Sequence, residues 1–354
     1  MIRVAHLLPT LEIGGRERTA IELARAGAAL GIAPLLITHE RAPEGRAMLS
    51  PGAVPHVALD SRAGDFDARL RAVLESRGTQ LVHAHGHVTA IHAAHLPVPR
   101  LATLHVAPGM AWRWALPIAR ALRRMNALAA VSDDLARRFA PLAGRRPLTI
   151  ATGIDLARYP PAPARRGEGL VIGMLSRLHP VKRHQDALAA VALLRARGID
   201  ARLAIAGDGP MEARLRTATR GLPHVELAGP ATDSAAFFAR IDAFLLCSGH
   251  EGMPLALIEA MASGLPCVAT AVGGVPDLVG PDGALLVPAR RPAALADALA
   301  GLHDEERRRT LGEAARRRAQ HFSIDRQAMA YAALYRSLVT AGGSSVPSSQ
   351  RKLG

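Results

Sequence analysis

The sequence predicts an α/β protein made of two doubly wound domains, each a parallel sheet with helices on both faces. Three observations support this prediction. Short, nearly continuous apolar strands alternate with helical segments, a pattern typical of parallel sheets that are covered on both faces. The alternation stops in a proline-rich stretch, Arg158 to Gly169, and then restarts. The chain of 354 residues is also too long for one ordinary core.

The elements of the first half follow from Ile2–Leu8, an apolar strand. A loop with Gly14 and Gly15 leads from it into a helix from about Glu17 to Leu30. Further strands are predicted at 34–38, 54–59, 81–84, 100–104, 127–131 and 148–151, with helices at 66–77 and 133–140.

The second half repeats this alternation and ends in two helices. Strands are predicted at 170–175, 201–206, 225–228, 241–247, 266–270 and 284–287, and helices at 305–320 and 324–339. We therefore expect an N-terminal domain at 1–160, a C-terminal domain at 161–323 and a flexible polar tail at 341–354.

Composition limits the setting in which the protein works. No run of about 18 apolar residues predicts a membrane-spanning helix, and the N-terminus lacks a signal-peptide pattern. Cys247 and Cys267 lie in apolar strand ends, as reduced core thiols do, so we expect a cytoplasmic protein. The net charge of +14 favours anionic partners without choosing among them. Only Lys182 and Lys352 are lysines among the 44 basic residues.

The stretch from Cys247 to Leu278 has the most informative pattern. A buried strand ends at Cys247, a glycine loop follows, and Pro254 stands where the first turn of a helix is predicted. That helix is apolar nearly all round except for Glu259, a carboxylate that needs a hydrogen-bonding partner if it is buried. Glu251 precedes it by eight residues.

Ligands of open parallel sheets bind beyond the carboxyl ends of the strands, which selects the loops that matter. In the first half these loops hold Gly14-Gly15, His83, His85 and His105. In the second half they are 176–183, 207–210 and the loop that holds Glu251. We expect them to line one cleft between the two domains.

Together these loops carry motifs in a recognisable order. They read G-G-R-E (14–17), T-L-H (103–105), V-S-D (131–133), T-G-I-D (152–155), S-R-L-H-P-V-K (176–182), A-G-D-G-P (206–210) and E-G-M-P-L-A-L-I-E-A-M-A-S-G-L-P (251–266). The chain resembles the retaining glycosyltransferases of family 4, which have the GT-B fold. The resemblance implies two Rossmann-like domains facing across a cleft, with the acceptor bound by the N-terminal domain and a nucleotide-diphospho-sugar by the C-terminal one. It also implies that the last helix, 324–340, crosses back to the N-terminal domain.

The resemblance assigns a role to each of these residues, beside a plainer alternative. Arg177 and Lys182 would clamp the donor diphosphate, whose leaving charge needs stabilising, unless they are solvated surface charges. Glu259 would accept hydrogen bonds from the ribose hydroxyls, unless it is a structural carboxylate, and Glu251 would contact the transferred sugar. Backbone N–H groups of the loop before the helix would face the phosphates; its residues are Gly252, Met253, Pro254 and Leu255.

The N-terminal half would add two further contacts to the donor. Gly14 and Gly15 would let the first loop approach the diphosphate closely, unless they form a plain turn. His105 would hydrogen-bond a sugar hydroxyl or steady the developing positive charge on the sugar. Asp277 stands where the family often has a glutamate, which puts a direct donor role for it in doubt.

No metal and no other cofactor is expected. No Asp-x-Asp cluster lies in a suitable loop, and GT-B enzymes generally work without a metal. His83 and His85 share one strand face, and with His87, His92 and His95 nearby they suggest a metal site. Without a carboxylate or cysteine at ligand spacing, histidines of the core or of the acceptor site are the preferred interpretation.

A basic segment with both tryptophans predicts an interfacial anchor. Indole rings settle at the headgroup level and guanidinium groups attract anionic lipid. Ordinary packing with solvated arginines is the alternative. The residues are Trp112, Arg113, Trp114, Arg120, Arg123 and Arg124.

The sequence thus predicts a retaining, metal-independent hexosyltransferase that acts in cell-envelope, lipid-linked or exopolysaccharide glycan synthesis. It would be cytoplasmic or peripheral on the inner face of the plasma membrane. A GT-B epimerase or hydrolase is one alternative. A basic nucleic-acid-binding protein is another, but with 3% aromatic residues the chain lacks stacking platforms for bases, so no nucleic-acid partner is expected. Nucleotide, hexose and acceptor are not predictable from spacing.

Overall fold

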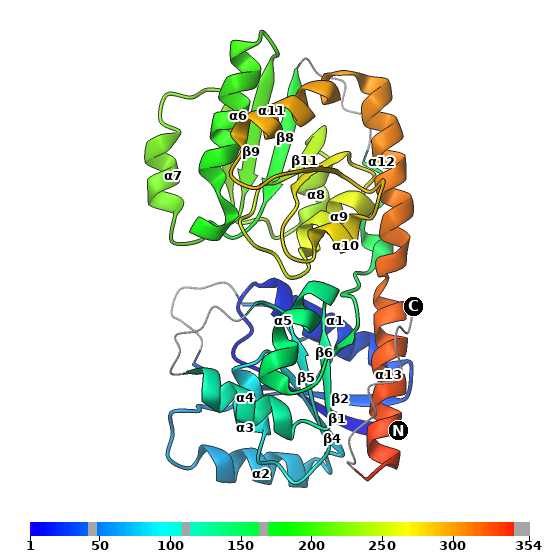
Figure 1. Cartoon of the computed structure of the whole chain (residues 1–354). Coiled ribbons are helices and arrows are strands. Elements are labelled where there is room, and N and C mark those ends of the chain that lie inside the picture. Colours follow the sequence, from blue (N-terminus) through cyan, green and yellow to red (C-terminus); the bar gives the residue numbers. More distant parts are fainter. Residues whose placement is uncertain (42–47, 108–113, 163–168, 343–354) are drawn as a thin grey trace. The chain divides into compact units, whose positions relative to one another are not determined.

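The computed structural model describes residues 1–41, 48–107, 114–162 and 169–342. The chain divides into two compact units, Met1–Ile154 with Ser323–Gly354 and Asp155–Phe322. Each unit is built on one parallel sheet with helices packed against it, as the alternation of strands and helices predicts (Figure 1). The α/β class is therefore confirmed.

The sheet of the first unit has the strand order β3-β2-β1-β4-β5-β6-β7, with every pairing parallel. The order reverses between β1 and β4, which makes this the topological switch point where such sheets bind ligands. The strands are β1 (Ile2–Leu8), β2 (Ile32–Thr38), β3 (His56–Ala58), β4 (Leu81–His85), β5 (Arg100–Leu104), β6 (Ala127–Ala130) and β7 (Leu148–Thr149).

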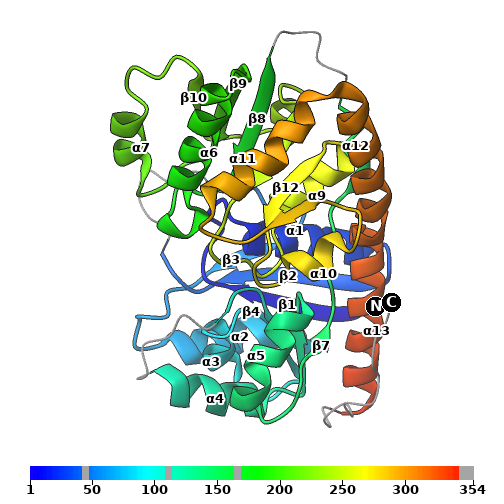
Figure 2. The same ribbon diagram turned by 45° about the horizontal axis from the view of Figure 1, so that its top comes forward.

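Helices cover both faces of this sheet. On one face the helices α3, α4 and α5 lie side by side, as both views show (Figures 1 and 2). The other face packs against α1 and α13, because Val4, Leu81 and Leu101 share a core with Leu23 of α1 and Tyr331 of α13. The helices are α1 (Gly15–Ala28), α2 (Phe66–Ser76), α3 (Thr89–Ala93), α4 (Ala115–Arg124), α5 (Asp133–Ala143) and α13 (Ile324–Thr340).

The helix α13 joins the first unit although it comes last in the chain. Ser323 caps it by accepting a hydrogen bond from the Arg326 N–H (3.2 Å), and Gln327 accepts one from the Gly153 N–H (3.1 Å). A side chain at Gly153 would overlap the carbonyl of Ser323, so only glycine permits this approach. Tyr331 and Tyr335 then lie fully buried against the sheet.

The sheet of the second unit has the order β10-β9-β8-β11-β12-β13, again all parallel, with its switch point between β8 and β11. Its strands are β8 (Leu170–Leu175), β9 (Ala201–Ala206), β10 (Val225–Gly229), β11 (Ala243–Leu246), β12 (Cys267–Thr270) and β13 (Leu285–Val287). Its helices are α6 (His184–Ala196), α7 (Glu212–Ala218), α8 (Ser234–Phe238), α9 (Leu255–Ala262), α10 (Val275–Val279), α11 (Pro292–Ala300) and α12 (Glu305–Ala319), with short 3-10 turns η2 (Leu156–Arg158), η3 (Pro180–Lys182), η4 (Gly301–His303) and η5 (Gln320–Phe322).

Alternation along β11 separates the two cores of this unit. Leu245 faces α6 and α11, whereas Phe244 faces the opposite side, where its ring packs edge-on to Phe238 of α8 (5.8 Å between centroids). The helix α9 lies on that side too, packed against α12. The switch point of the sheet thus lies between two separate layers of helices.

The residues that follow Ile154 pack on the second unit. Tyr159 is 2% exposed, and its hydroxyl lies 3.1 Å from Ser234 Oγ. The Ala162 N–H donates to the carbonyl of Ser263 (2.7 Å). The boundary at 154–155 therefore precedes the proline-rich stretch, of which 163–168 lie outside the described residues.

Within the described ranges, no helix has the length and apolar character that crossing a membrane would require.

Candidate functional site

Two loops meet at the switch point of the second sheet. One follows β8 and runs through η3, and the other follows β11 and leads to α9. The Gly249 N–H donates to the Val181 carbonyl (2.7 Å), and the Cys247 thiol donates to the carbonyls of Lys182 and Arg183 (3.3 Å each). Burial raises the pKa of Cys247 to about 12, so this thiol stays protonated and keeps donating.

An ion pair lies where these loops touch. Lys182 Nζ is 2.6 Å from Glu251 Oε1, and Ser248 Oγ donates to the same oxygen at 2.5 Å. The side chains of Lys182 and Glu251 are only 20% and 9% exposed. The structure thus joins two of the predicted site residues that are 69 positions apart. Arg177, on the same loop as Lys182, is exposed.

Glycines allow the backbone of these loops to pack closely. Gly207 has a φ of +140°, and a side chain there would overlap the Ser176 carbonyl. Gly273 has a φ of +54°, and a side chain there would overlap the Glu251 carbonyl, which also accepts a hydrogen bond from the Gly274 N–H (3.1 Å). The glycine turn after β12 therefore supports Glu251 through the backbone.

The helix α9 begins beside this ion pair. Pro254 is its N-cap residue with an extended ψ of 109°, so the expectation that Pro254 lies in the first turn is wrong by one residue. Gly252 and Met253 precede it in the loop, and Leu255 is the first helical residue. Glu259 lies in the second turn and is 1% exposed.

In the first unit, Gly14 and Gly15 stand at the start of α1. Gly14 is the N-cap residue in an extended conformation, and a side chain there would overlap the Glu17 carboxylate. Arg16 Nε donates to Glu17 Oε1 (2.7 Å). A side chain at Gly86, which follows β4, would come within 3.4 Å of an Arg16 guanidinium nitrogen, so this charge lies near the carboxyl end of β4. Burial, and to a smaller extent the charge of Arg16, lowers the pKa values of His87 and His105.

Four histidines gather at the switch point of the first sheet. The parallel register pairs His6 of β1 with His83 of β4, and His85 follows on the same face. His6 Nδ1 is 3.0 Å from His85 Nε2, and His85 Nδ1 is 3.4 Å from His105 Nε2. His83 instead contacts the Tyr335 hydroxyl with Nδ1 and Thr103 Oγ1 with Nε2, each at 2.7 Å.

His6 was not predicted as part of any site. The common doubly wound order places the first strand beside the fourth, so the predicted strands at 2–8 and 81–84 carried a signal for this pair, although 77 residues separate His6 from His83. Together His6, His83 and His85 offer three buried nitrogens within 4.8 Å of one another, a spacing at which a metal ion could bind. Of the other histidines considered with them, His92 packs against His39 with tilted rings (4.5 Å between centroids), and His95 accepts a hydrogen bond from Arg124 (2.9 Å).

Family models match both halves of the chain. Residues 13–158 match the model described as Glycosyltransferase Family 4, and residues 169–305 match Glycosyl transferases group 1. EpsF of Bacillus subtilis, described as a putative glycosyltransferase, is 30% identical over 302 residues, covering 75% of this chain and 78% of EpsF. The chain belongs to the family 4 glycosyltransferases.

A second relative has a name that states its donor and its acceptor. The GDP-mannose-dependent α-(1-6)-phosphatidylinositol dimannoside mannosyltransferase of Mycobacterium tuberculosis is 29% identical over 292 residues, covering 78% of this chain and 75% of that enzyme. Among solved structures, Anabaena HepE in complex with UDP-glucose superposes with a TM-score of 0.83 at 18% identity, covering 96% of this chain and 100% of HepE. This likeness confirms the GT-B fold.

Asp277 is exposed in α10. Its backbone carbonyl accepts a hydrogen bond from Arg318 (2.7 Å).

The described part of the basic segment is the helix α4. Ile118, Ala121 and Leu122 are buried on one side. The exposed side carries Trp114 (47% exposed) and Leu116 (57%), together with three arginines, Arg120, Arg123 and Arg124. Trp112 and Arg113 lie outside the described residues.

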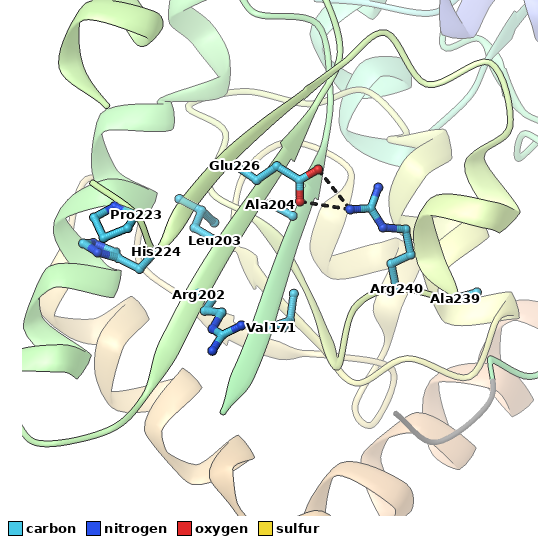
Figure 3. A pocket seen from close by; sticks show the side chains of 9 residues that line it. All are labelled: Val171, Arg202, Leu203, Ala204, Pro223, His224, Glu226, Ala239 and Arg240. Carbon is cyan, nitrogen blue, oxygen red and sulfur yellow. Dashed lines mark hydrogen bonds and ion pairs between the residues drawn. The ribbon is translucent and has the colours of Figure 1, made fainter. Parts of the chain in front are cut away.

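A hollow of about 530 Å³ in the second unit lies away from these loops (Figure 3). Val171, Arg202 and Glu226, which line it, are each the second residue of their strand, so the hollow lies at the amino ends of β8, β9 and β10. Glu226 and Arg240 form an exposed ion pair across it (2.9 Å). Because ligands of such sheets bind at the opposite edge, we assign the hollow no role in the family's reaction.

Proposed function

We propose that this family 4 member is a retaining hexosyltransferase, which moves a hexose from a nucleotide-diphospho-sugar to an acceptor hydroxyl. The observation that carries the proposal is the Lys182–Glu251–Ser248 cluster at the switch point of the second sheet, beside the start of α9. A cation and a helix N-terminus at one sheet edge suit the diphosphate of the donor, and the oriented carboxylate beside them suits the hydroxyls of its sugar.

In this proposal each residue of the second unit has one task. Lys182 and the exposed Arg177 bind diphosphate oxygens and stabilise the negative charge that develops as the sugar leaves. Glu251 accepts hydrogen bonds from sugar hydroxyls, and Glu259 accepts them from the ribose. The backbone from Gly252 to Leu255 faces the phosphates.

The reaction proceeds on one face of the sugar. The bond from the anomeric carbon to the phosphate oxygen breaks, and the acceptor oxygen bonds to the same face of that carbon. The acceptor's proton passes to the leaving phosphate oxygen. Gly14 and Gly15 give the diphosphate a side-chain-free approach, and His105 hydrogen-bonds a sugar hydroxyl. The two cations supply the positive charge in this scheme, and no metal or other cofactor takes part in it.

The named relatives narrow the substrates to be tried first. HepE is seen with UDP-glucose, and the mycobacterial relative is named for GDP-mannose and a phosphatidylinositol-linked acceptor. We therefore propose a UDP- or GDP-hexose as donor and a lipid-linked or polysaccharide acceptor of the cell envelope. The protein would then work at the cytoplasmic side of the plasma membrane.

A thermal-shift screen with UDP-glucose, GDP-mannose and the parent nucleotides tests the donor site. A donor present at 100 times its Kd should stabilise the fold by about 2.7 kcal/mol and raise Tm. Glu259→Ala should abolish this shift, whereas Glu226→Ala, which alters an exposed carboxylate of the same unit, should keep it. No shift with any nucleotide sugar would contradict the donor assignment.

NMR of the product tests the retaining mechanism. The product should keep the donor's anomeric configuration, and inversion would refute the retaining mechanism.

We further propose that α4 contacts an anionic membrane surface. Exposed Trp114 and Leu116 supply apolar groups, and three exposed arginines of the same helix supply positive charge. The first turn of α4 holds no acidic residue that would oppose this charge.

Co-sedimentation with vesicles tests this contact. The protein should bind phosphatidylglycerol vesicles and leave phosphatidylcholine vesicles in the supernatant. Trp114→Ala should weaken the binding several-fold, while Met329→Ala, an exposed apolar residue of α13 (53% exposed), should not. Equal binding by both variants would refute the anchor.

A further inference from the structure

A chain of three imidazoles runs through the first sheet to its carboxyl edge. It starts at His6 in β1, passes through His85 at the end of β4 and reaches His105 just after β5. The nitrogen–nitrogen distances are 3.0 Å and 3.4 Å. His6 and His85 are each 1% exposed, whereas His105 is only partly buried. The chain therefore connects the core with a residue that a ligand can reach.

The sheet itself holds these rings in line. Parallel pairing of β1, β4 and β5 sets His6 level with His83, and His85 level with Thr103. Side chains alternate along a strand, so His85 points to the same face as His83 and His6. The rings of His6 and His85 also stack, with centroids 5.3 Å apart and planes 20° apart. Neither ring can turn over without breaking this packing.

All three imidazoles are neutral near pH 7. Burial lowers the pKa of His6 to about 4, and burial with the charge of Arg16 lowers that of His105 to about 3. Burial and the neighbouring His83, His6 and His105 lower the pKa of His85 well below its usual value. A neutral imidazole has one N–H and one acceptor nitrogen.

With one N–H and one acceptor nitrogen on each ring, the three histidines can form two hydrogen-bonding patterns. If His6 Nδ1 donates to His85 Nε2, then His85 Nδ1 donates to His105 Nε2, and His105 carries its proton on Nδ1. If the direction is reversed, His105 Nε2 donates and Nδ1 is the acceptor. In both patterns the tautomer of His105 is tied to that of His6.

We propose that His85 and His6 are positioning residues that fix the tautomer and ring orientation of His105. The group that His105 presents to a sugar hydroxyl, donor or acceptor, is then set by residues in the core. The inference rests on the sugar-contacting role given to His105 under the proposed function. The alternative use of the same rings, a metal site formed by His6, His83 and His85, would have to displace Thr103 or Tyr335 from His83, because both ring nitrogens of His83 have hydrogen-bonding partners.

Nitrogen NMR of protein with ¹⁵N-labelled histidine tests the tautomer directly. The two nitrogens of a neutral imidazole have distinct shifts, and His105→Gln identifies the His105 signals. The wild type should show one tautomer of His105. His6→Leu should give a mixture, whereas His6→Asn, which keeps a polar group near the Nδ1 position, should restore a single tautomer.

A matched control separates positioning from plain stability. Tyr335→Phe removes one hydrogen bond of neighbouring His83 without entering the chain. It should lower Tm but leave the His105 signals unchanged. With the donor found by thermal shift, His6→Leu should lower kcat about 10-fold with little change in donor KM, by analogy with metal-bound histidines, which lose about 10- to 100-fold in activity without the partner that orients them. Tyr335→Phe should leave kcat unchanged.

Each outcome decides one point. A mixed tautomer in the wild type, or an unchanged one in His6→Leu, overturns the positioning role. Stoichiometric Zn²⁺ binding that His6→Leu abolishes overturns it in favour of a metal site. A fixed tautomer that needs His6, with no transfer from any nucleotide sugar, keeps the positioning chain and refutes the proposed function instead.

Discussion

At the scale of single residues, the most consequential contact is the ion pair between Lys182 and Glu251. Burying two charges costs desolvation free energy, which is recovered only with good geometry and further hydrogen bonds. Here the nitrogen–oxygen distance is 2.6 Å, and Ser248 donates to the same carboxylate oxygen. Glu251 is thereby held in one orientation, and a phosphate oxygen that binds Lys182 must share it with this carboxylate.

Replacing Lys182 by methionine should lower kcat/KM about 100-fold, because a positive charge aimed at the leaving phosphate is lost. Steady-state kinetics with the donor found by thermal shift checks this. Arg240→Ala removes an exposed cation at the far edge of the same sheet and should change nothing. If Lys182→Met raised only KM and left kcat intact, Lys182 would bind the donor without stabilising the transition state.

At the scale of elements, the turn between β12 and α10 is fixed by its contact with the loop of Glu251. Gly273 combines a φ of +54° with a closeness to the Glu251 carbonyl that no side chain would allow. Gly221, between α7 and β10, has a similar φ of +79° but open space around it. Substitutions at the two positions therefore separate the cost of a left-handed backbone from the cost of crowding.

Gly221→Ala should cost about 1 kcal/mol of unfolding free energy, from the left-handed backbone alone. Gly273→Ala should cost more and should also weaken donor binding, because the Glu251 loop has to move. Chemical denaturation and the donor-induced thermal shift measure the two effects. Equal losses of stability in the two variants, with the thermal shift preserved, would show that the turn does not support Glu251.

Elements were predictable where one face or both faces of a strand are buried. The pattern of apolar residues predicted both ends of β1 and β8 correctly, because buried positions of a strand are occupied by apolar residues. The apolar pattern alone could not show that Lys182 pairs with Glu251 or that His6 contacts His85, since these contacts depend on strand order, register and side-chain conformation. Pro254 is the N-cap rather than a residue of the first turn because its ψ is extended, and the amino-acid sequence alone does not determine that angle.

At the scale of the whole molecule, buried histidines make stability depend on pH. His6 and His39 are each 1% exposed, and burial lowers their pKa values to about 4 and about 3; His92 and Arg16 lower that of His39 further. In the unfolded chain these groups bind a proton below about pH 6.5. Between pH 6.5 and the folded pKa the unfolded state therefore binds more protons than the folded one.

Stability should thus be complete above pH 6.5 and fall as the pH drops toward 4. Each of these two histidines should lower the free energy of unfolding by about 1.4 kcal/mol for each pH unit between pH 6.5 and its folded pKa. Tm measured at pH 7.5 and at pH 5.5 checks the direction, and His39→Gln should reduce the difference. A Tm that is equal at both pH values would contradict the neutral, buried state of these rings.

The return of α13 to the first unit has a consequence for synthesis of the protein. Tyr331, Tyr335 and Leu338 complete the core over β1, β4 and β5, yet they are translated only after the entire second unit. A nascent chain on the ribosome therefore has a second unit that is complete in sequence while the histidine-bearing face of its first sheet still lacks α13. A chain truncated before Tyr331 would leave the core over that face incomplete, a liability for aggregation and degradation rather than a local defect.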